Sequence, residues 1–144
     1  AIDSVHHNAK LNGLDNVETL EGDAFEALKA LADEKEKFDI VVLDPPAFIP
    51  RRRDQKAGEQ AYARLNQLGL RLLERDGVLV SASCSMHLSQ EKLVDIIRGS
   101  GRKIDRFVQL LEQGHQAPDH PIIPGIPETD YIKSCFVRSL TGFM

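Results

Sequence analysis

The sequence predicts an α/β fold, with a doubly wound, mostly parallel sheet and an antiparallel last strand. Three observations support this fold class. Segments with apolar residues at helical spacing alternate with short apolar runs typical of buried strands. Two of these runs, at 38–43 and 78–83, consist largely of branched or small residues, as strands covered on both faces do. Near the end of the chain, two strand-like segments follow one another with no helix between them, which predicts an antiparallel pair.

Helical spacing and short apolar runs define the elements of the first half. We expect a helix over 2–12, a strand over 17–21, a helix over 25–31, a strand over 38–43, a polar loop over 49–58 and a helix over 61–73. Asn12-Gly13 is a C-terminal stop signal for the first helix, and Asp23 is placed to cap the second. In the third helix, Leu65, Leu68 and Leu72 share one side.

The second half continues the alternation and then changes. Asp76-Gly77 predicts a break before a strand over 78–83, and Ser89 is expected to start a helix that Gly99 and Gly101 end. Strands are then expected over 104–112 and 131–138, joined by a long Pro-rich loop over 117–127. No repeat or linker divides the chain, so residues 1–144 are expected to form one domain, with helices on both faces of the sheet.

Composition narrows the class of protein. At 144 residues, with 42% hydrophobic residues, the chain is long enough to bury a core. No apolar run approaches a membrane span and no secretory leader is visible, so we expect a cytoplasmic protein without a membrane partner. Two cysteines make no disulfide framework, and the five histidines lack zinc-ligand spacing, so no metal is expected. A net charge of −4 argues against broad electrostatic coating of nucleic acid.

The most informative motif is Asp44-Pro45-Pro46-Ala47-Phe48, directly after the apolar run at 38–43. Two prolines cannot continue a strand, so Asp44 is left at its carboxyl end, where open α/β sheets bind their ligands. A stiff turn followed by an aromatic ring suits a planar substrate held beside an acid. An ordinary strand end with a proline turn would give the same pattern.

A second polar strand end, Ser83-Cys84-Ser85, follows the next strand along the chain, after one intervening helix. Small neighbours leave room for a substrate to approach the sulfur, and a thiolate is a strong nucleophile. Because the alternating pattern makes the two strands neighbours, Cys84 and Asp44 are expected at one edge of the sheet. The alternative is that Cys84 is a small buried apolar residue, the commoner fate of a lone cysteine.

Two weaker motifs accompany this pair. Gly22-Asp23-Ala24-Phe25 offers an acid for an amino group and Ala24 or Phe25 for an aromatic ring, although Asp23 is equally well explained as a helix cap. Arg51, Arg52 and Arg53 follow the Asp-Pro-Pro turn and could contact phosphate beside an extruded base, or form a solvated loop. His115 and His120 lie in a loop that either reaches the site or braces the sheet edge.

Together these segments resemble the methyltransferase domain of the bacterial large-subunit ribosomal RNA methyltransferase I family, which uses S-adenosylmethionine to form 5-methylcytosine. The Asp-Pro-Pro-aromatic strand end also resembles the fourth motif of methyltransferases that act on nucleic-acid bases. The resemblance covers nearly the whole chain, in order and spacing. It rests on the following segments: 8–14, 22–25, 44–48, 83–85, 118–121 and 127–133.

The resemblance implies a Rossmann-like class I methyltransferase fold and a role for each matching residue. Cys84 is then the nucleophile that attacks the base, and Asp44 lies between cofactor and base. Asp23, with Ala24, Phe25 and Pro45, would complete the cofactor site, while Phe48 and the three arginines 51–53 would meet ribosomal RNA. A homodimer is compatible with the family.

One departure from the family is large. Family members carry a Gly-rich first motif, an acid that ends the second strand and an amino-terminal RNA-binding domain, all upstream of the segments matched here. We therefore expect residues 1–144 to be the carboxyl-terminal part of a class I methyltransferase domain, with a sheet that lacks its first two strands. The amino-terminal RNA-binding domain is expected to be absent from this chain. Two other hypotheses stay open: methylation of a guanine or an exocyclic amine, and an inactive fragment that serves as a binding or folding module.

Overall fold

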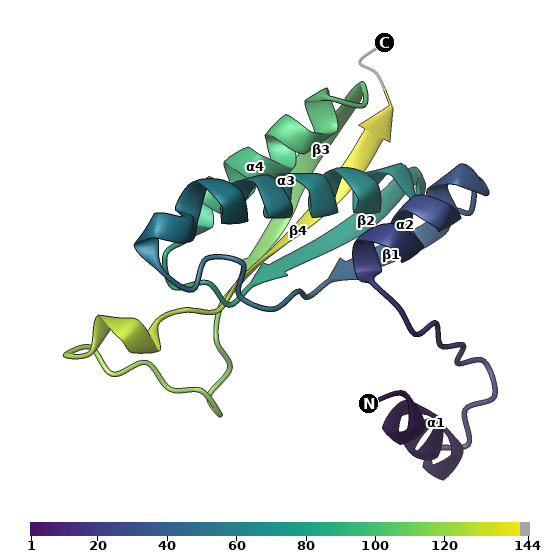
Figure 1. The fold of residues 1–144 in the computed structure, drawn as a ribbon, viewed down its shortest axis with the longest axis horizontal. Coiled ribbons are helices and arrows are strands. Elements are labelled where there is room, and N and C mark those ends of the chain that lie inside the picture. Colours follow the sequence, from purple (N-terminus) through teal and green to yellow (C-terminus); the bar gives the residue numbers. More distant parts are fainter. Residues whose placement is uncertain (142–144) are drawn as a thin grey trace.

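Four strands form one mixed sheet in the computed structural model, which describes residues 1–141 (Figure 1). The strand order is β1-β2-β4-β3. The strands are β1 (Phe38–Leu43), β2 (Leu73–Ser83), β3 (Arg106–Gly114) and β4 (Lys133–Thr141). Strands β1 and β2 are parallel, whereas β4 is antiparallel to both of its neighbours. The α/β class and the antiparallel last strand are therefore confirmed.

Three helices pack on one face of this sheet (Figure 1). They are α2 (Ala24–Asp33), α3 (Gln55–Arg71) and α4 (Gln90–Arg102). Their apolar sides and alternate residues of the strands bury a single core around Tyr62, Leu79 and Leu93. Gly69 allows α3 to approach the sheet, since an added Cβ would lie 2.9 Å from Leu43 Cδ1.

The other face of the sheet carries no helix among residues 1–141, so the expectation of helices on both faces is wrong for this part of the chain. The reason is that all three connecting helices return over the same side. On the open face, Ile40 is 62% exposed and Val42 is 64% exposed. β1 is also an edge strand, paired only with β2 among the described residues.

The amino-terminal segment stands apart from the sheet. Helix α1 (Ile2–Leu11) buries none of its residues, and Figure 1 shows an extended segment joining it to α2. The strand expected over 17–21 is wrong: these residues are extended but pair with no strand. A strand needs a partner for its backbone groups, and none of the described strands lies beside it.

No helix among residues 1–141 is long and apolar enough to cross a membrane.

Several element boundaries differ from expectation for local reasons. The loop expected over 49–58 contains a 3-10 turn, η1 (Arg52–Asp54), and the first turn of α3, which begins at Gln55. Helix α4 continues through the two glycines expected to end it, because Ser100 donates to the carbonyl of Ala63 at 3.0 Å and holds the helix against α3. The expected break at 76–77 is an irregularity within β2, with Asp76 at a φ of +62°.

The long connection between β3 and β4 is a hairpin loop, as expected, with a short turn η2 (Pro127–Thr129) within it. The side chain of Gln116 braces this loop by accepting hydrogen bonds from the backbone of Tyr131 at 2.7 Å and Ile132 at 3.1 Å. His120 lies 3.2 Å from Asp119 within the same exposed loop. The bracing expected of the histidines is thus carried out by a neighbouring glutamine.

Candidate functional site

The candidate site begins where β1 and β2 end side by side. Leu43, the last residue of β1, pairs with Ser81, two residues before the end of β2. Because these strands are parallel, Asp44 and Cys84 leave the sheet at the same edge. The sulfur of Cys84 lies 3.9 Å from the carbonyl oxygen of Pro45. The thiol and the Asp-Pro-Pro turn are therefore direct neighbours.

A cavity of about 560 Å³ lies between the end of β1 and the start of α2. Its walls are mainly apolar, and two carboxylates, Asp23 and Asp44, are among its lining residues. Ala24, Phe25, Pro45 and Phe48 also line it. This volume falls within the range of small-molecule sites, which combine apolar walls with a few polar groups. The cavity therefore brings together every residue expected to bind a cofactor.

The positions of Asp23 and Phe25 follow from the start of α2. Asp23 Oδ1 accepts hydrogen bonds from the backbone of Phe25 at 2.9 Å and Glu26 at 3.1 Å, so the carboxylate caps the helix as its sequence position predicts. The Phe25 ring packs against Phe48, with 6.0 Å between the ring centroids. The Arg64 guanidinium lies over the Phe25 ring, 5.1 Å from its centroid. The cap and the rings thus fix one wall of the cavity.

Phe48 belongs to the cavity wall and to the core. Its ring centroid lies 4.8 Å from that of Tyr62, in a tilted arrangement. The adjoining Ile49 is 1% exposed. Gly58 of α3 lies directly against this segment, because an added Cβ would be 2.6 Å from the carbonyl oxygen of Phe48. The glycine therefore permits the close approach that holds the turn in place.

Replacing Gly58 by alanine is expected to lower the free energy of unfolding by about 1–3 kcal/mol, the usual cost of overpacking. The clash with Phe48 outweighs the better helix propensity of alanine. Gly99→Ala is the matched control: Gly99 also lies within a helix, but an added Cβ meets nothing within 4 Å. That control is expected to gain up to about 1 kcal/mol. Thermal unfolding of both variants tests the prediction, and equal stabilisation of the two would contradict it.

Three buried hydroxyl groups hold the segment around Cys84. The Tyr62 hydroxyl lies 2.8 Å from Ser85 Oγ and accepts a hydrogen bond from Ser83 Oγ, also at 2.8 Å. Ser85 Oγ accepts a hydrogen bond from the backbone of Ile49 at 3.2 Å. The network thus ties both neighbours of Cys84 to α3 and to the Asp-Pro-Pro-Ala-Phe segment. Cys84 itself is partly exposed.

A buried lysine approaches the same segment from β4. Lys133 is 7% exposed, and its ammonium donates to the carbonyl oxygens of Ser85 at 2.7 Å and Leu88 at 2.6 Å. Burial lowers the pKa of Lys133, and the nearby groups Asp130 and Cys84 oppose that shift. The ammonium thus binds the residue that directly follows the thiol.

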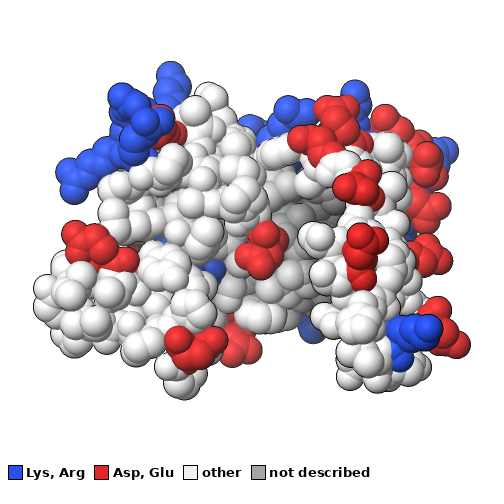
Figure 2. All heavy atoms as spheres, turned by 60° about the horizontal axis from the view of Figure 1, so that its bottom comes forward, with Lys and Arg blue, Asp and Glu red and all other residues white. Residues whose placement is uncertain are grey.

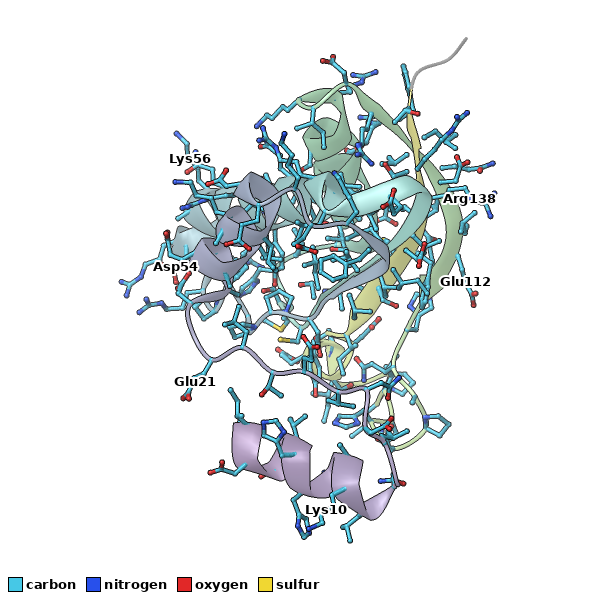
Figure 3. The ribbon with its side chains drawn as sticks, turned by 90° about the vertical axis from the view of Figure 1, so that its right-hand side faces the viewer. Lys10, Glu21, Asp54, Lys56, Glu112 and Arg138 are labelled. Carbon is cyan, nitrogen blue, oxygen red and sulfur yellow. The ribbon has the colours of Figure 1, made fainter. Side chains whose placement is uncertain are left out.

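The basic cluster lies beyond the Asp-Pro-Pro turn. Arg51 pairs with Asp54 at 2.8 Å, while Arg52 and Arg53 are exposed in η1. Figure 2 shows a group of basic side chains at the upper left of the face in view, while most acidic side chains lie on the right and others are scattered over the centre and lower left. Figure 3 shows Asp54 and Lys56 at the start of α3, on the opposite side from Glu112 and Arg138. A local positive surface thus exists despite the net negative charge.

The predicted residues divide between two sides of the Asp-Pro-Pro turn. One side is the cavity, with Asp23, Asp44 and Phe48 in its walls. The thiol of Cys84 lies beside Pro45 but is not among the lining residues, and neither are the three arginines 51–53. We expected a single cleft that holds both the acid and the thiol, with the arginines on its rim. The structure has a cavity that holds the acid, and the thiol lies next to the wall of that cavity. No cluster of three His, Cys, Asp or Glu side chains in the described chain could hold a metal ion.

Sequence reasoning missed Tyr62 and Lys133 as parts of this site. A signal existed for the lysine: in a strand over 131–138, position 133 shares a face with Cys135 and Val137, which are both buried. A charged residue on such a face requires an explanation. Tyr62 lies on the inward stripe of α3 with Leu65, so its hydroxyl needed a buried partner.

Comparison with curated proteins gives relatives that match nearly the whole chain. The Ribosomal RNA large subunit methyltransferase I of Klebsiella pneumoniae is 37% identical over 140 residues, which is 96% of this chain. The protein of the same name in Escherichia coli is 36% identical over 140 residues, and a candidate ribosomal RNA large subunit methyltransferase of Methanocaldococcus jannaschii is 38% identical over 138. The chain spans about 35% of the length of these relatives. No family model matches the chain.

Solved structures with a similar fold include proteins named as methyltransferases. A candidate S-adenosylmethionine-dependent methyltransferase from Streptococcus mutans covers 94% of this chain, with a TM-score of 0.75 and 20% identity; the match takes in 34% of that protein. NSun6 from Pyrococcus horikoshii, solved with SFG, covers 97% with a TM-score of 0.56 and 22% identity, over 38% of its own length. The Rossmann-like methyltransferase fold and the family resemblance of the motifs are thus confirmed.

Proposed function

We propose that this chain, homologous over nearly its whole length to proteins named ribosomal RNA large subunit methyltransferase I, is part of an S-adenosylmethionine-dependent enzyme that forms 5-methylcytosine in large-subunit ribosomal RNA. One observation carries the proposal. The Cys84 sulfur lies 3.9 Å from the Pro45 carbonyl oxygen, so a nucleophile and an acid-proline turn meet at adjacent strand ends. A methyltransferase without covalent chemistry would not need a partly exposed thiol at this place.

The residues present fit the adenine end of S-adenosylmethionine. The cavity of about 560 Å³ offers the Phe25 ring and Ala24 to a flat heterocycle, and the Asp23 carboxylate to its amino group. Asp44 and Pro45 form the wall on the side of the thiol. When bound, the cofactor supplies an electrophilic methyl group carried on a sulfonium sulfur. Sequence pattern, cavity chemistry and homology to methyltransferases all support this assignment.

Cys84 and Asp44 would act on the base. The ring carbon C5 of cytosine is too electron-poor to accept a methyl group directly. A thiolate at Cys84 adds to C6, forming a carbon–sulfur bond and moving the electron pair of the C5–C6 double bond onto C5. Asp44 carries a proton to N3, which neutralises the negative charge that this addition places on the ring, and takes the proton back when the thiolate leaves. After C5 has been methylated, loss of its proton to water restores the double bond and expels the thiolate.

RNA would be held next to this site by the segment that follows the turn. Arg52 and Arg53 are exposed and suited to phosphate contact, which positions a nucleic acid without reading its sequence. Phe48 would border the extruded base, although its ring packs against Phe25 and Tyr62 here. The local cluster supports RNA contact in a chain whose overall charge is negative.

RNA containing 5-fluorocytosine tests the proposal. Fluorine at C5 cannot leave as a proton would, so the C6–sulfur bond persists and the protein stays covalently attached to RNA. We expect the full-length protein to form this adduct in the presence of S-adenosylmethionine, and Cys84→Ala to form none. Cys135→Ala is the matched control and should still be trapped, since Cys135 is fully buried. Methylation of ordinary RNA without any trapped adduct would favour guanine or exocyclic-amine chemistry instead.

A further inference from the structure

Lys133 belongs to neither the cavity nor the basic cluster, yet it is a buried cation beside the candidate nucleophile. Strand pairing places it opposite Ser83, the last residue of β2, so its side chain lies where the chain leaves the sheet towards Cys84. It is 7% exposed. No carboxylate of residues 1–141 lies within ion-pair distance of its ammonium. A buried charge without such a partner is costly and requires a reason.

The hydrogen bonds of Lys133 all serve the turn after Cys84. The carbonyl of Ser85 accepts from the Lys133 ammonium at 2.7 Å and from the backbone of Leu88 at 3.1 Å, which closes the turn over 85–88. The carbonyl of Leu88 accepts a second ammonium proton at 2.6 Å. On the other side, the hydroxyls of Tyr62, Ser83 and Ser85 fix the same segment. The turn is thus clamped from both β4 and α3.

Hydrogen bonding alone does not explain a lysine at this position. A neutral amide could donate to two carbonyls at a smaller desolvation cost than an ammonium. What an amide cannot supply is a positive charge. Lys133 pairs with Ser83 and its ammonium binds the carbonyl of Ser85, so this charge lies beside the segment that carries Cys84. A cation next to a thiol favours its thiolate form, the reactive species.

We propose that Lys133 is a positioning residue for Cys84: its ammonium fixes the turn that carries the thiol and provides the positive charge that stabilises the thiolate. This inference rests on the proposed role of Cys84 as nucleophile. It extends the site to β4, on the side of Cys84 away from the Asp-Pro-Pro turn. The lysine needs no contact with cofactor or base.

Alkylation of Cys84 by iodoacetamide at pH 7 tests the inference without RNA or cofactor. Cys84 is partly exposed, whereas burial raises the pKa of the Cys135 thiol to about 11, so the reagent reports on Cys84. The Cys84→Ala variant gives the background. We expect Lys133→Met to slow alkylation about tenfold, because loss of a neighbouring positive charge makes the thiolate form less favourable. Lys133→Arg keeps the charge and should retain most of the rate. Lys103→Met, at an exposed lysine, should leave it unchanged.

The direction of change separates the two roles of the lysine. If Lys133 were only a structural clamp, its loss would loosen the turn and expose the thiol, and alkylation would become faster. An equal or faster rate in Lys133→Met therefore overturns the inference. If that variant does not fold, the exposed residue Asp130 decides: Asp130→Asn removes the carboxylate that offsets the lysine charge. Faster alkylation of Asp130→Asn supports the inference, and an unchanged or slower rate overturns it.

The outcome is independent of the proposed activity. Slow alkylation of Lys133→Met with no trapped 5-fluorocytosine adduct in the wild-type protein would mean that the lysine controls the thiol but that the thiol does not attack cytosine. An adduct in the wild type with unchanged alkylation of Lys133→Met would support cytosine chemistry and reject the role of the lysine.

Discussion

Cys84→Ala is expected to lower methyl transfer to ribosomal RNA by orders of magnitude in the full-length protein, while the affinity for S-adenosylmethionine stays nearly unchanged. Loss of a covalent nucleophile removes the reaction path itself. Cofactor affinity should survive because Cys84 is not among the residues that line the cavity. Methyl incorporation and calorimetric cofactor binding, measured on the same preparation, test both parts.

Cys135→Ala controls for the loss of a thiol as such. Cys135 lies in the core, 0% exposed, and Gln90 donates a hydrogen bond to its sulfur at 3.3 Å, so its loss should affect stability rather than turnover. Assays are therefore made below the unfolding temperature of both variants. Substantial methyl transfer by Cys84→Ala would reject the thiol mechanism.

Asp44→Asn is expected to damage cofactor binding and turnover together. This carboxylate lines the cavity and directly precedes the proline that contacts Cys84, so it borders both the cofactor and the base sites. The substitution keeps the shape and removes the charge. A charge-assisted hydrogen bond contributes about 1.5–3 kcal/mol, so the affinity for S-adenosylmethionine should fall about ten- to hundredfold.

Asp39→Asn is the matched control for that prediction. Asp39 lies on the same strand but is exposed and does not line the cavity. Calorimetry of the two variants should show weaker binding for Asp44→Asn alone. If Asp44→Asn binds the cofactor and turns over like the wild type, Asp44 is only a strand terminus, as its sequence alone also allows.

The parts of this fold that could be predicted from sequence are those with local signals. Asp23 caps α2 because a carboxylate before an apolar periodic segment satisfies free backbone donors. The ends of β1 and β2 were predictable because prolines, and a cysteine flanked by serines, follow buried apolar runs. Parallel pairing then brings Asp44 and Cys84 to one edge.

The parts that could not be predicted depend on residues distant in sequence. Lys133 donates to the carbonyl of Ser85, which is 48 positions away in the sequence. No local sequence pattern predicts which turn a side chain at that distance will contact. The segment at 17–21 has the composition of a strand, but a strand forms only where a partner exists. The early start of α3 was missed because its first turn is polar and gives no apolar periodicity.

The open face of β1 also affects how this chain behaves at high concentration. Ile40 and Val42 project from an edge strand with one side of its backbone ladder free among the described residues. Such an edge is a template for strand addition by another chain, and apolar side chains strengthen the attachment. Asp39 alternates to the helix-bearing face of the strand, with Val41 and Leu43, so its charge does not interrupt this apolar surface. The edge of β1 therefore favours association between copies of this chain.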